Sequence, residues 1–260
     1  MDLQLKDKVV LVTGGGKGIG AAITKTCAEE GALAVVVDRD AQACQELRDQ
    51  LSARGLKINC MVEDLSSAQN CEAVIERTVR SFHDIHALVN NAGINDKIGL
   101  EHGRPQDFLC SLERNLLHYY NMAHYAVPHL KRSRGSIVNI SSKTAVTGQG
   151  GTSGYVASKG AILALTREWA AELLPHGIRV NAVLPAEVMT PLYRQWLDSF
   201  PNPQDQLRRV VAKIPLERRM TTADEIASMV AFLISSKASH ITGQHLFVDG
   251  GYVHLDRALT

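Results

Sequence analysis

The sequence predicts an α/β fold, a doubly wound parallel sheet flanked by helices on both faces. Short β-branched runs alternate with longer helical patterns along the chain. These runs are mostly apolar, as strands buried on both faces of a parallel sheet require. The chain also lacks repeats, charge blocks and linkers rich in Gly, Ser or Pro. Together these features predict one domain spanning residues 1–260.

The expected elements follow from the alternation. Strands are predicted at residues 9–12, 34–37, 58–62, 87–89, 137–140, 180–184 and 246–248. Helices are predicted over residues 18–30, 41–53 and 68–82. Helix ends are indicated by Gly31 and by Pro175-His176-Gly177. A proline-containing stretch then interrupts the pattern, and we expect a substrate-covering insertion at about 188–215, over the cleft where parallel sheets bind ligands.

Composition excludes several classes of partner. Lys and Arg number 28 against 27 Asp and Glu, which argues against nucleic acid as a partner. The five cysteines are odd in number and scattered, as in a reduced cytoplasmic protein. No apolar run approaches the ~18 residues of a membrane span, so no membrane association is expected. His118, His124 and His129 do not share a helix face, and we expect no metal site.

A glycine-rich turn joins the first strand to the first helix. It reads Thr13-Gly14-Gly15-Gly16-Lys17-Gly18-Ile19-Gly20. Glycines let the backbone turn tightly and approach a pyrophosphate, and the helix start supplies N–H donors. We therefore expect Gly14, Lys17, Gly18, Ile19 and Gly20 to bind a dinucleotide.

Carboxylates and small residues follow the next strands. Asp38 ends the second strand, where its carboxylate can accept hydrogen bonds from the adenosine ribose and repel a 2′-phosphate, which favours NAD. Arg39 and Lys17 argue the other way, since either could bind that phosphate, so NADP stays open. Asp64 follows the third strand, where it could meet the adenine amino group. Small residues in 90–93 would let a flat cofactor pass.

A third group of residues carries chemistry. The strand at 137–140 delivers Ser141 and Ser142 at its carboxyl end. Tyr155 and Lys159 stand four residues apart, so on a helix they share one face. A serine at a strand end and a glycine-rich turn accompany this pair, which indicates more than chance spacing.

With these motifs in this order, the chain resembles the short-chain dehydrogenase/reductase family over nearly its whole length. The resemblance implies a Rossmann-type domain, a nicotinamide cofactor and a homotetramer. It implies that Tyr155 is the general base, that Lys159 binds the nicotinamide ribose and that Ser142 holds the substrate oxygen. A free tyrosine has a pKa of about 10, and lowering it to ~7 requires roughly 4 kcal/mol of phenolate stabilisation. Lys159 and the cationic nicotinamide ring are the positive charges that favour the phenolate. Asn115 would anchor a water behind Lys159, and Ser142 rather than Ser141 has the family spacing. The further cofactor-binding residues that it implies are Leu65, Asn91, Ala92, Gly93, Pro185, Val188 and Thr190.

The substrate is indicated by the loops around the expected pocket. They are polar, as selection of a polyhydroxylated substrate requires. The segments 113–120, 141–150, 185–190 and 249–259 resemble the bacterial L-fucose dehydrogenase branch of the family. That branch implies oxidation of L-fucose, or a related aldose, at the anomeric carbon to the aldonolactone. We expect sugar hydroxyls to bind Asn95, Ser142, Lys143, Gln149, Tyr155 and Glu187.

Glu187 marks a departure from the family pattern. The residues Pro185-Ala186-Glu187 stand where the family has Pro-Gly, which places a carboxylate near the nicotinamide. Tyr193 or Trp196 of the expected insertion could cover the substrate, although ordinary packing explains them equally well.

Two other functions remain open. The first is a 3-oxoacyl-[acyl-carrier-protein] reductase, or another secondary-alcohol dehydrogenase of the same family; the near-neutral charge does not favour an acidic carrier protein. The second is a cofactor-binding protein without catalysis, whose usual sign would be a damaged catalytic set. Here the four family positions are complete.

Overall fold

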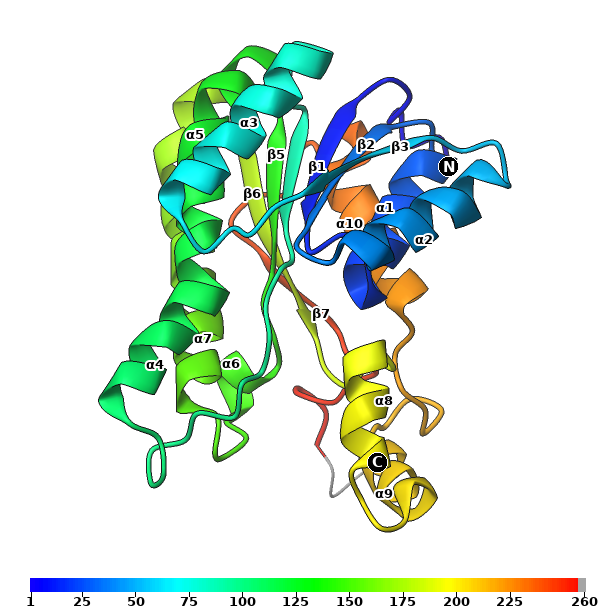
Figure 1. The fold of residues 1–260 in the computed structure, drawn as a ribbon, viewed down its shortest axis with the longest axis vertical. Coiled ribbons are helices and arrows are strands. Elements are labelled where there is room, and N and C mark those ends of the chain that lie inside the picture. The colour runs from blue at the N-terminus through cyan, green and yellow to red at the C-terminus, as the bar shows by residue number, and fades with distance from the viewer. Residues whose placement is uncertain (257–260) are drawn as a thin grey trace.

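The computed structural model describes residues 1–256, which form a seven-stranded, fully parallel sheet (Figure 1). Its order is β3-β2-β1-β4-β5-β6-β7. The strands are β1 (Val9–Thr13), β2 (Leu33–Asp38), β3 (Ile58–Val62), β4 (Ala87–Asn90), β5 (Ser136–Ile140), β6 (Arg179–Pro185) and β7 (His245–Val248). All the expected strands are present, and each observed bound lies within one residue of its expected position.

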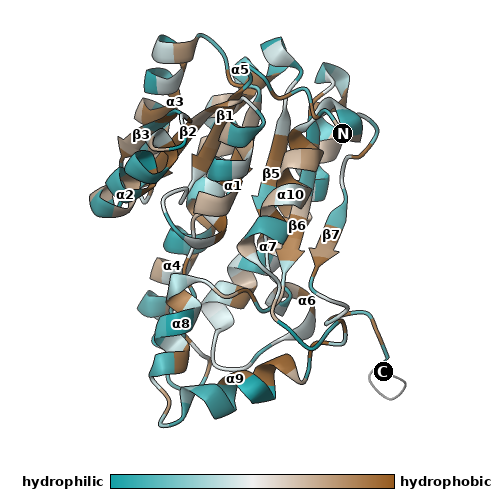
Figure 2. Ribbon diagram, turned by 90° about the vertical axis from the view of Figure 1, so that its right-hand side faces the viewer, coloured by the Kyte–Doolittle hydropathy of each residue, from teal (hydrophilic) through white to brown (hydrophobic). Residues whose placement is uncertain are grey.

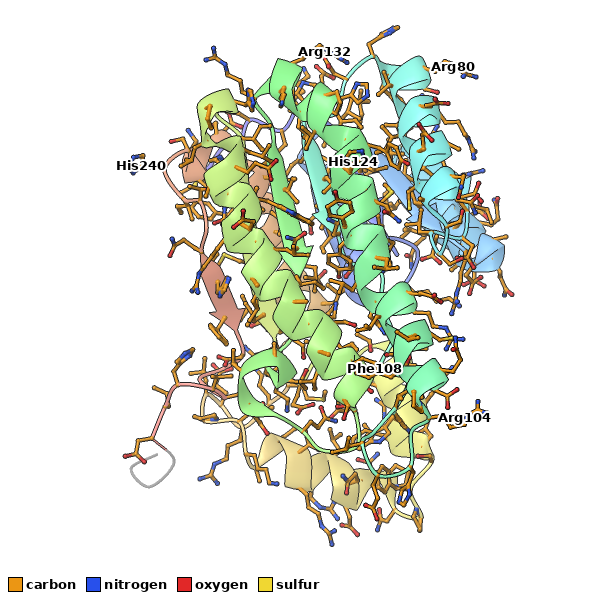
Figure 3. All side chains as sticks on the ribbon, turned by 90° about the vertical axis from the view of Figure 1, so that its left-hand side faces the viewer. Arg80, Arg104, Phe108, His124, Arg132 and His240 are labelled. Atoms are coloured by element: carbon orange, nitrogen blue, oxygen red, sulfur yellow. The ribbon has the colours of Figure 1, made fainter. Side chains whose placement is uncertain are left out.

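Helices cover both faces of this sheet, as predicted. One face carries α1 (Gly18–Glu29), α2 (Ala41–Ser52) and α10 (Ala223–Ile234) (Figures 1 and 2). The other carries α3 (Ala68–Phe82), α5 (His118–Ser133) and α7 (Ser153–Leu173), which Figure 3 views from outside. The first three expected helices were therefore right to within one residue at each end.

The strands pack between these two layers through two main apolar clusters. Side chains on one side of the strands, Leu11 and Ile137 among them, pack with Tyr119 of α5 and Ile162 of α7. Val12, pointing to the other side, packs with residues of α1 and α10. Figure 2 shows the strands coloured as hydrophobic between helices whose outer faces are mixed or hydrophilic. Burial on both faces explains why the strand sequences lack polar alternation.

A second group of elements lies beyond the carboxyl ends of the strands (Figure 1). It consists of α4 (Pro105–Leu112), the π-helix η1 (Glu113–Leu117), α6 (Thr144–Thr147), α8 (Pro191–Asp198) and α9 (Pro203–Val211). Two short 3₁₀ turns, η2 (Leu174–His176) and η3 (Ser236–Ala238), complete the chain order. Helices α8 and α9 are the content of the expected insertion at 188–215, and its covering role stays a prediction.

Two further expectations concern the tail segment and a membrane span. Residues 257–259 of the segment 249–259 lie outside the described residues. Among the helices of residues 1–256, none combines the length and the apolar character needed to cross a membrane.

Candidate active site

The glycine turn after β1 is closed by contacts that leave no room for side chains. Gly14 has φ +60°, and a Cβ on Gly20 would lie 1.9 Å from the Gly14 carbonyl oxygen. The side chain of Asn91 donates hydrogen bonds to the carbonyls of Thr13 (3.0 Å) and Gly14 (2.9 Å). The Thr13 hydroxyl in turn accepts the backbone N–H groups of Asn91 (3.0 Å) and Ala92 (3.2 Å). The turn is thus tied to the end of β4.

The sequence did not predict the hydrogen bonds that Thr13 and the Asn91 side chain make within the glycine turn. Asn91 was expected to bind cofactor, but its side-chain nitrogen is used inside the protein, so only its other groups can face a ligand. Thr13 was not singled out, because a threonine ending a buried strand has no distinctive signal of its own.

Asp38 and Lys17 are both engaged at the second strand end. Asp38 accepts the backbone N–H of Gly16 and that of Asp40, each at 3.0 Å. A carboxylate offers about four acceptor positions, so Asp38 keeps acceptor capacity toward a ligand. Lys17 forms an ion pair with Asp40, with 2.6 Å between Nζ and Oδ2. The positive charge of Lys17 is therefore already matched by a carboxylate.

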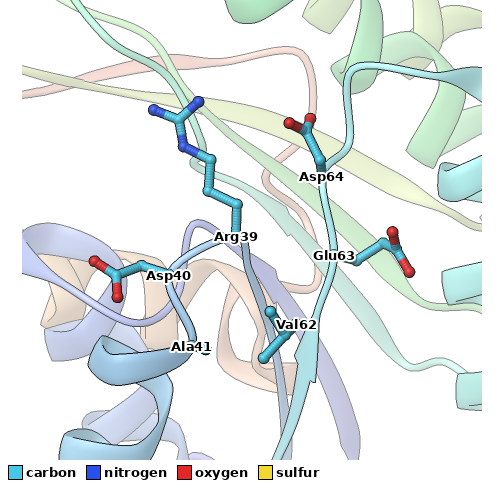
Figure 4. Close-up of a pocket in the computed structure, with 6 residues that line it drawn as sticks. All are labelled: Arg39, Asp40, Ala41, Val62, Glu63 and Asp64. Atoms are coloured by element: carbon cyan, nitrogen blue, oxygen red, sulfur yellow. The ribbon is translucent and has the colours of Figure 1, made fainter.

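An open hollow of about 700 Å³ lies where β2 and β3 end (Figure 4). Arg39 and Asp64 both line it, and in Figure 4 both side chains extend from the strand ends to the same side. Hydrogen bonds from Ser66 lower the pKa of Asp64, and the charge of Arg39 lowers it further. The Leu65 side chain is instead buried in the core, so that only its backbone could meet a ligand.

The loop after β6 meets the same glycine turn. A Cβ on Gly18 would lie 3.3 Å from Thr190 Cγ2, so these two segments are in contact. Val188 is buried in the core and pairs with Thr221 in an isolated bridge, which fixes the loop. Ile19 packs partly buried against the same core. The Pro185 carbonyl accepts the Lys143 backbone N–H at 2.9 Å, joining this loop to the end of β5.

These residues fit an extended dinucleotide. The tight glycine turn lets a pyrophosphate approach the start of α1, and the hollow beside Asp38 and Arg39 has room for a nucleoside. Gly93 lies farther along, where a Cβ would be 3.0 Å from Asn115 Oδ1 and 3.5 Å from Lys159 Nζ. The absent side chain leaves the backbone of Gly93 beside the Lys159 amine.

Ser142 and Tyr155 lie together at the end of β5. The Ser142 hydroxyl oxygen accepts hydrogen bonds from the Thr144 N–H (3.2 Å) and the Thr144 hydroxyl (3.0 Å). Its own proton is therefore available for a third partner. Burial raises the pKa of Tyr155 above its ordinary value, and a hydrogen bond with Ser142 opposes this. Ser141 points elsewhere, donating to the Lys159 carbonyl at 2.8 Å.

Lys159 is buried in α7 beside Tyr155. Its Nζ lies 5.6 Å from the centre of the Tyr155 ring. It donates hydrogen bonds to the Ile140 carbonyl (2.8 Å) and the Tyr119 hydroxyl (3.0 Å). Burial lowers the pKa of Lys159 to about 7. Tyr119 was not among the expected site residues, although it follows Asn115 by four positions.

Asn115 occupies the π-helix η1 and is fully buried. Its Oδ1 accepts the Ile94 N–H at 2.7 Å, and its Nδ2 donates to the Ser111 carbonyl at 3.0 Å. The Ser111 hydroxyl donates to Asp96 Oδ1 at 2.9 Å. The Asn115 side chain therefore holds the loop after β4 against helix α4. The water expected behind Lys159 stays a prediction.

Two of the expected substrate residues form a nearly buried ion pair. Lys143 contacts Glu187, with side-chain exposures of 10% and 15%. The Lys143 amine also lies 3.9 Å from the centre of the Tyr252 ring. Burial, and then the neighbouring Glu187 carboxylate, raise the pKa of Tyr193. Lys143, Glu187, Tyr193 and Tyr252 are called the polar cluster below.

The other two expected substrate residues make different contacts. Asn95 accepts the Lys97 backbone N–H at 3.2 Å, closing a local turn. Gln149 is exposed in a loop whose Gly148, Gly150 and Gly151 all have positive φ. Tyr252 belongs to the segment 249–259 that was expected around the pocket, but the residue itself was not singled out, because its contact with Lys143 depends on packing between distant segments.

The three histidines of the expected helical segment engage separate partners. His118 is buried against the Arg114 carbonyl (3.1 Å), and burial lowers its pKa to about 4. His124 stacks on Tyr120, and His129 contacts Arg132. Within residues 1–256, no group of three or more His, Cys, Asp or Glu side chains could hold a metal ion.

The burial of Lys159 gives a pH-dependent stability prediction. Its folded pKa lies below the unfolded value of about 10.4, so the fold penalises the charged form. The penalty is absent above about pH 10, grows as pH falls and is complete below about pH 7. Lys159→Met should therefore raise the free energy of unfolding at pH 6 by up to roughly 4 kcal/mol, with less gain at pH 9.

Urea unfolding at both pH values measures this difference, with the surface variant Lys25→Met as control. Lys25 is 38% exposed in its side chain, so its variant should show the same small change at both pH values. A Lys159→Met variant that gained no more stability at pH 6 than at pH 9 would contradict the prediction.

Comparison with known proteins places this geometry in a family. A family model described as enoyl-(acyl carrier protein) reductase matches residues 14–253. L-fucose dehydrogenase of Bos taurus is 35% identical over 96% of this chain and 91% of its own length. The 3-oxoacyl-[acyl-carrier-protein] reductase FabG of Thermotoga maritima is 33% identical over 96% of this chain and its full length.

Solved structures agree over nearly the whole chain. The crystal structure of Cj0485 dehydrogenase superposes with a TM-score of 0.94 at 46% identity, covering 100% of this chain and 99% of that one. The crystal structure of L-sorbose reductase from Gluconobacter frateurii, complexed with NADPH and L-sorbose, superposes with a TM-score of 0.93 at 27% identity. It covers 98% of this chain and 100% of that one. Sequence, fold and glycine turn therefore agree, and the chain belongs to the short-chain dehydrogenase/reductase family, as an oxidoreductase that uses a nicotinamide cofactor.

Proposed function

We propose that the chain oxidises L-fucose, or a related aldose, at the anomeric carbon to the aldonolactone, with NAD as hydride acceptor. The observation that carries the proposal is the polar cluster beside Ser142. Lys143 and Glu187 are nearly buried there, and an apolar substrate would seal their charges from water without replacing the lost hydration. Sugar hydroxyls can donate to Glu187 and accept from Lys143. Relatives named for sugars support the same substrate class.

Tyr155, Ser142 and Lys159 perform the proton chemistry in this proposal. Tyr155 as phenolate removes the proton from the anomeric hydroxyl, while the C–H electron pair leaves as hydride and the carbon–oxygen double bond of the lactone forms. The cofactor, when bound, supplies the hydride acceptor. Ser142, whose proton is bonded to Tyr155 in the absence of substrate, donates it to the substrate oxygen, since Thr144 already occupies its acceptor positions. Lys159 and a positively charged nicotinamide favour the phenolate against the burial that opposes it.

The acceptor is proposed as NAD rather than NADP. Asp38 keeps acceptor capacity toward the ribose, and Lys17 is paired with Asp40 rather than available to a phosphate. Arg39 at the hollow remains the residue that could bind a 2′-phosphate. A carboxylate next to a phosphate is repulsive, so Asp38 decides the preference.

A homotetramer is proposed as the assembly. Leu109, Leu117 and Tyr120 on α4, η1 and α5 are about half exposed. Large apolar side chains gathered on one series of helices are typical of a surface that another copy covers. These helices form the outer face seen in Figure 3.

The catalytic proposal is tested by following the absorbance of reduced nicotinamide. NAD or NADP is mixed with L-fucose, D-arabinose, L-galactose, D-glucose or D-mannose. L-fucose with NAD should react fastest, and Tyr155→Phe should lower kcat about 10³-fold because the base is lost. Tyr125→Phe, a packing tyrosine of α5, should leave turnover unchanged. Silence on every sugar, with activity on a 3-oxoacyl thioester and reduced cofactor, would establish the alternative reductase instead.

The role of the polar cluster is tested with Glu187→Gln, which keeps the shape and removes the charge. Hydrogen bonds to charged groups contribute about 1.5–3 kcal/mol, so KM for L-fucose should rise at least tenfold while cofactor affinity stays the same. Glu217→Gln removes an exposed carboxylate paired with Arg219 and serves as control. Unchanged sugar kinetics in a folded Glu187→Gln protein would remove Glu187 from the substrate site.

The glycine turn is tested with Gly20→Ala. The added Cβ would meet the Gly14 carbonyl at 1.9 Å, so the turn must open and the affinity for NADH should fall at least tenfold. Gly160→Ala, whose Cβ would meet nothing within 4 Å, is the matched control on α7. Fluorescence titration with NADH measures both. Equal affinity of the two variants would show that the turn tolerates a side chain.

A further inference from the structure

The amine of Lys159 has two partners inside the protein, and neither carries a charge. The Ile140 carbonyl lies 2.8 Å from Nζ and the Tyr119 hydroxyl 3.0 Å. The Tyr119 hydroxyl also donates to the same Ile140 carbonyl at 2.9 Å, closing a triangle of three polar groups. Because its proton goes to that carbonyl, the Tyr119 oxygen faces Lys159 as an acceptor.

Tyr119 is placed there by α5. Its side chain is fully buried in the main apolar cluster, and its ring centre lies 5.0 Å from Lys159 Nζ. The neighbouring Tyr120 points outward and is 52% exposed. A buried tyrosine needs a partner for its hydroxyl, and Ile140 alone would satisfy that need. The contact with Lys159 is therefore additional to what packing requires.

The groups that face Lys159 come from four elements. Its own helix contributes Tyr155, and α5 contributes Tyr119 and His118, while β5 contributes the Ile140 carbonyl and the loop after β4 contributes Gly93. His118 is neutral at ordinary pH, since burial lowers its pKa to about 4. Among the ion pairs of residues 1–256, none includes Lys159. Neutral oxygens alone therefore hold this buried cation in place.

We propose that Tyr119 is a positioning residue for Lys159: its hydroxyl accepts an N–H of the amine, favours the ammonium form and leaves the third N–H directed to the Tyr155 side. The inference rests on the proposed roles of Tyr155 and Lys159. A second consequence follows from the direction of the bonds. The Tyr119 proton is committed to a carbonyl, so Tyr119 holds the charge of Lys159 and does not conduct protons away from it.

The sign of the effect follows from the charge. Without the Tyr119 hydroxyl, the ammonium loses an acceptor and the neutral amine becomes more favoured. A less charged Lys159 stabilises the Tyr155 phenolate less, so the base forms only at higher pH. A hydrogen bond to a charged group is large enough to move this titration by about one pH unit.

The test compares Tyr119→Phe with Tyr120→Phe on whichever alcohol the unmodified protein oxidises. In Tyr119→Phe the acidic limb of the pH profile of kcat/KM should move about one pH unit to higher pH. At pH values below the limb, kcat/KM should therefore fall tenfold, while its plateau value at high pH stays unchanged. Tyr120→Phe should match the unmodified protein. The Ile140 carbonyl keeps its bond from Lys159, so in Tyr119→Phe the amine is the one group that loses a partner. Tyr119→Leu provides a second replacement should the phenylalanine disturb packing.

A measurement without cofactor or substrate separates this inference from the proposed function. The free energy of unfolding in urea is measured at pH 5 and pH 9 for the unmodified protein and for Tyr119→Phe. Losing the hydroxyl penalises the charged amine further, so Tyr119→Phe should lose more stability at pH 5 than at pH 9, and this pH-dependent difference should vanish in a Lys159→Met background. An unmoved limb together with an equal loss of stability at both pH values in folded Tyr119 variants would overturn the inference. Unchanged turnover in Tyr155→Phe would instead overturn the proposed function, and the unfolding measurement would still report on Tyr119.

Discussion

The parallel sheet imposes the constraint on which the site depends. Because every strand runs in one direction, every carboxyl end lies at one edge, and the loops that follow must share it. The glycine turn follows β1, Asp38 ends β2, Ser142 follows β5 and Pro185 ends β6. Residues far apart in the chain therefore meet because all the strands run in the same direction. The helix α7 joins this edge through β5, by way of the bonds between Lys159 and Ile140 and between Ser141 and the Lys159 carbonyl.

Three lysines at this edge have different partners for their positive charges. Lys17 pairs with Asp40 at the surface, and Lys143 pairs with Glu187 against an aromatic ring. Lys159 alone among the three has only neutral oxygens as partners. A carboxylate beside Lys159 would cancel its field at Tyr155, whereas oxygen acceptors hold the cation and leave that field intact. Lys159 is therefore buried, despite the unfavourable desolvation, at the position where the proposed mechanism needs an uncancelled charge.

Sequence patterns predicted the elements and the order of the motifs, because both depend on local periodicity and on short spacings. Lys159 could be placed with Tyr155, since positions four apart on one helix share a face. The partners of these residues could not be placed in the same way. The contact of Tyr119 with Lys159, that of Tyr252 with Lys143 and the use of Asn91 inside the glycine turn all depend on packing between distant segments. The spacing of Tyr119, four residues after Asn115, is the one sequence feature that could have placed its side chain near the site.

The π-helix at Glu113–Leu117 lets one additional residue fit between α4 and α5 without turning either helix. In a π turn, residues five apart are bonded as residues four apart are in an α-helix, so the turn holds one residue more. In a regular α-helix, by contrast, one additional residue would rotate α4 by about 100° relative to α5. Ser111 would then leave Asp96, and the loop after β4 would lose its anchor on Asn115. The π turn therefore keeps the polar contacts on its two sides aligned.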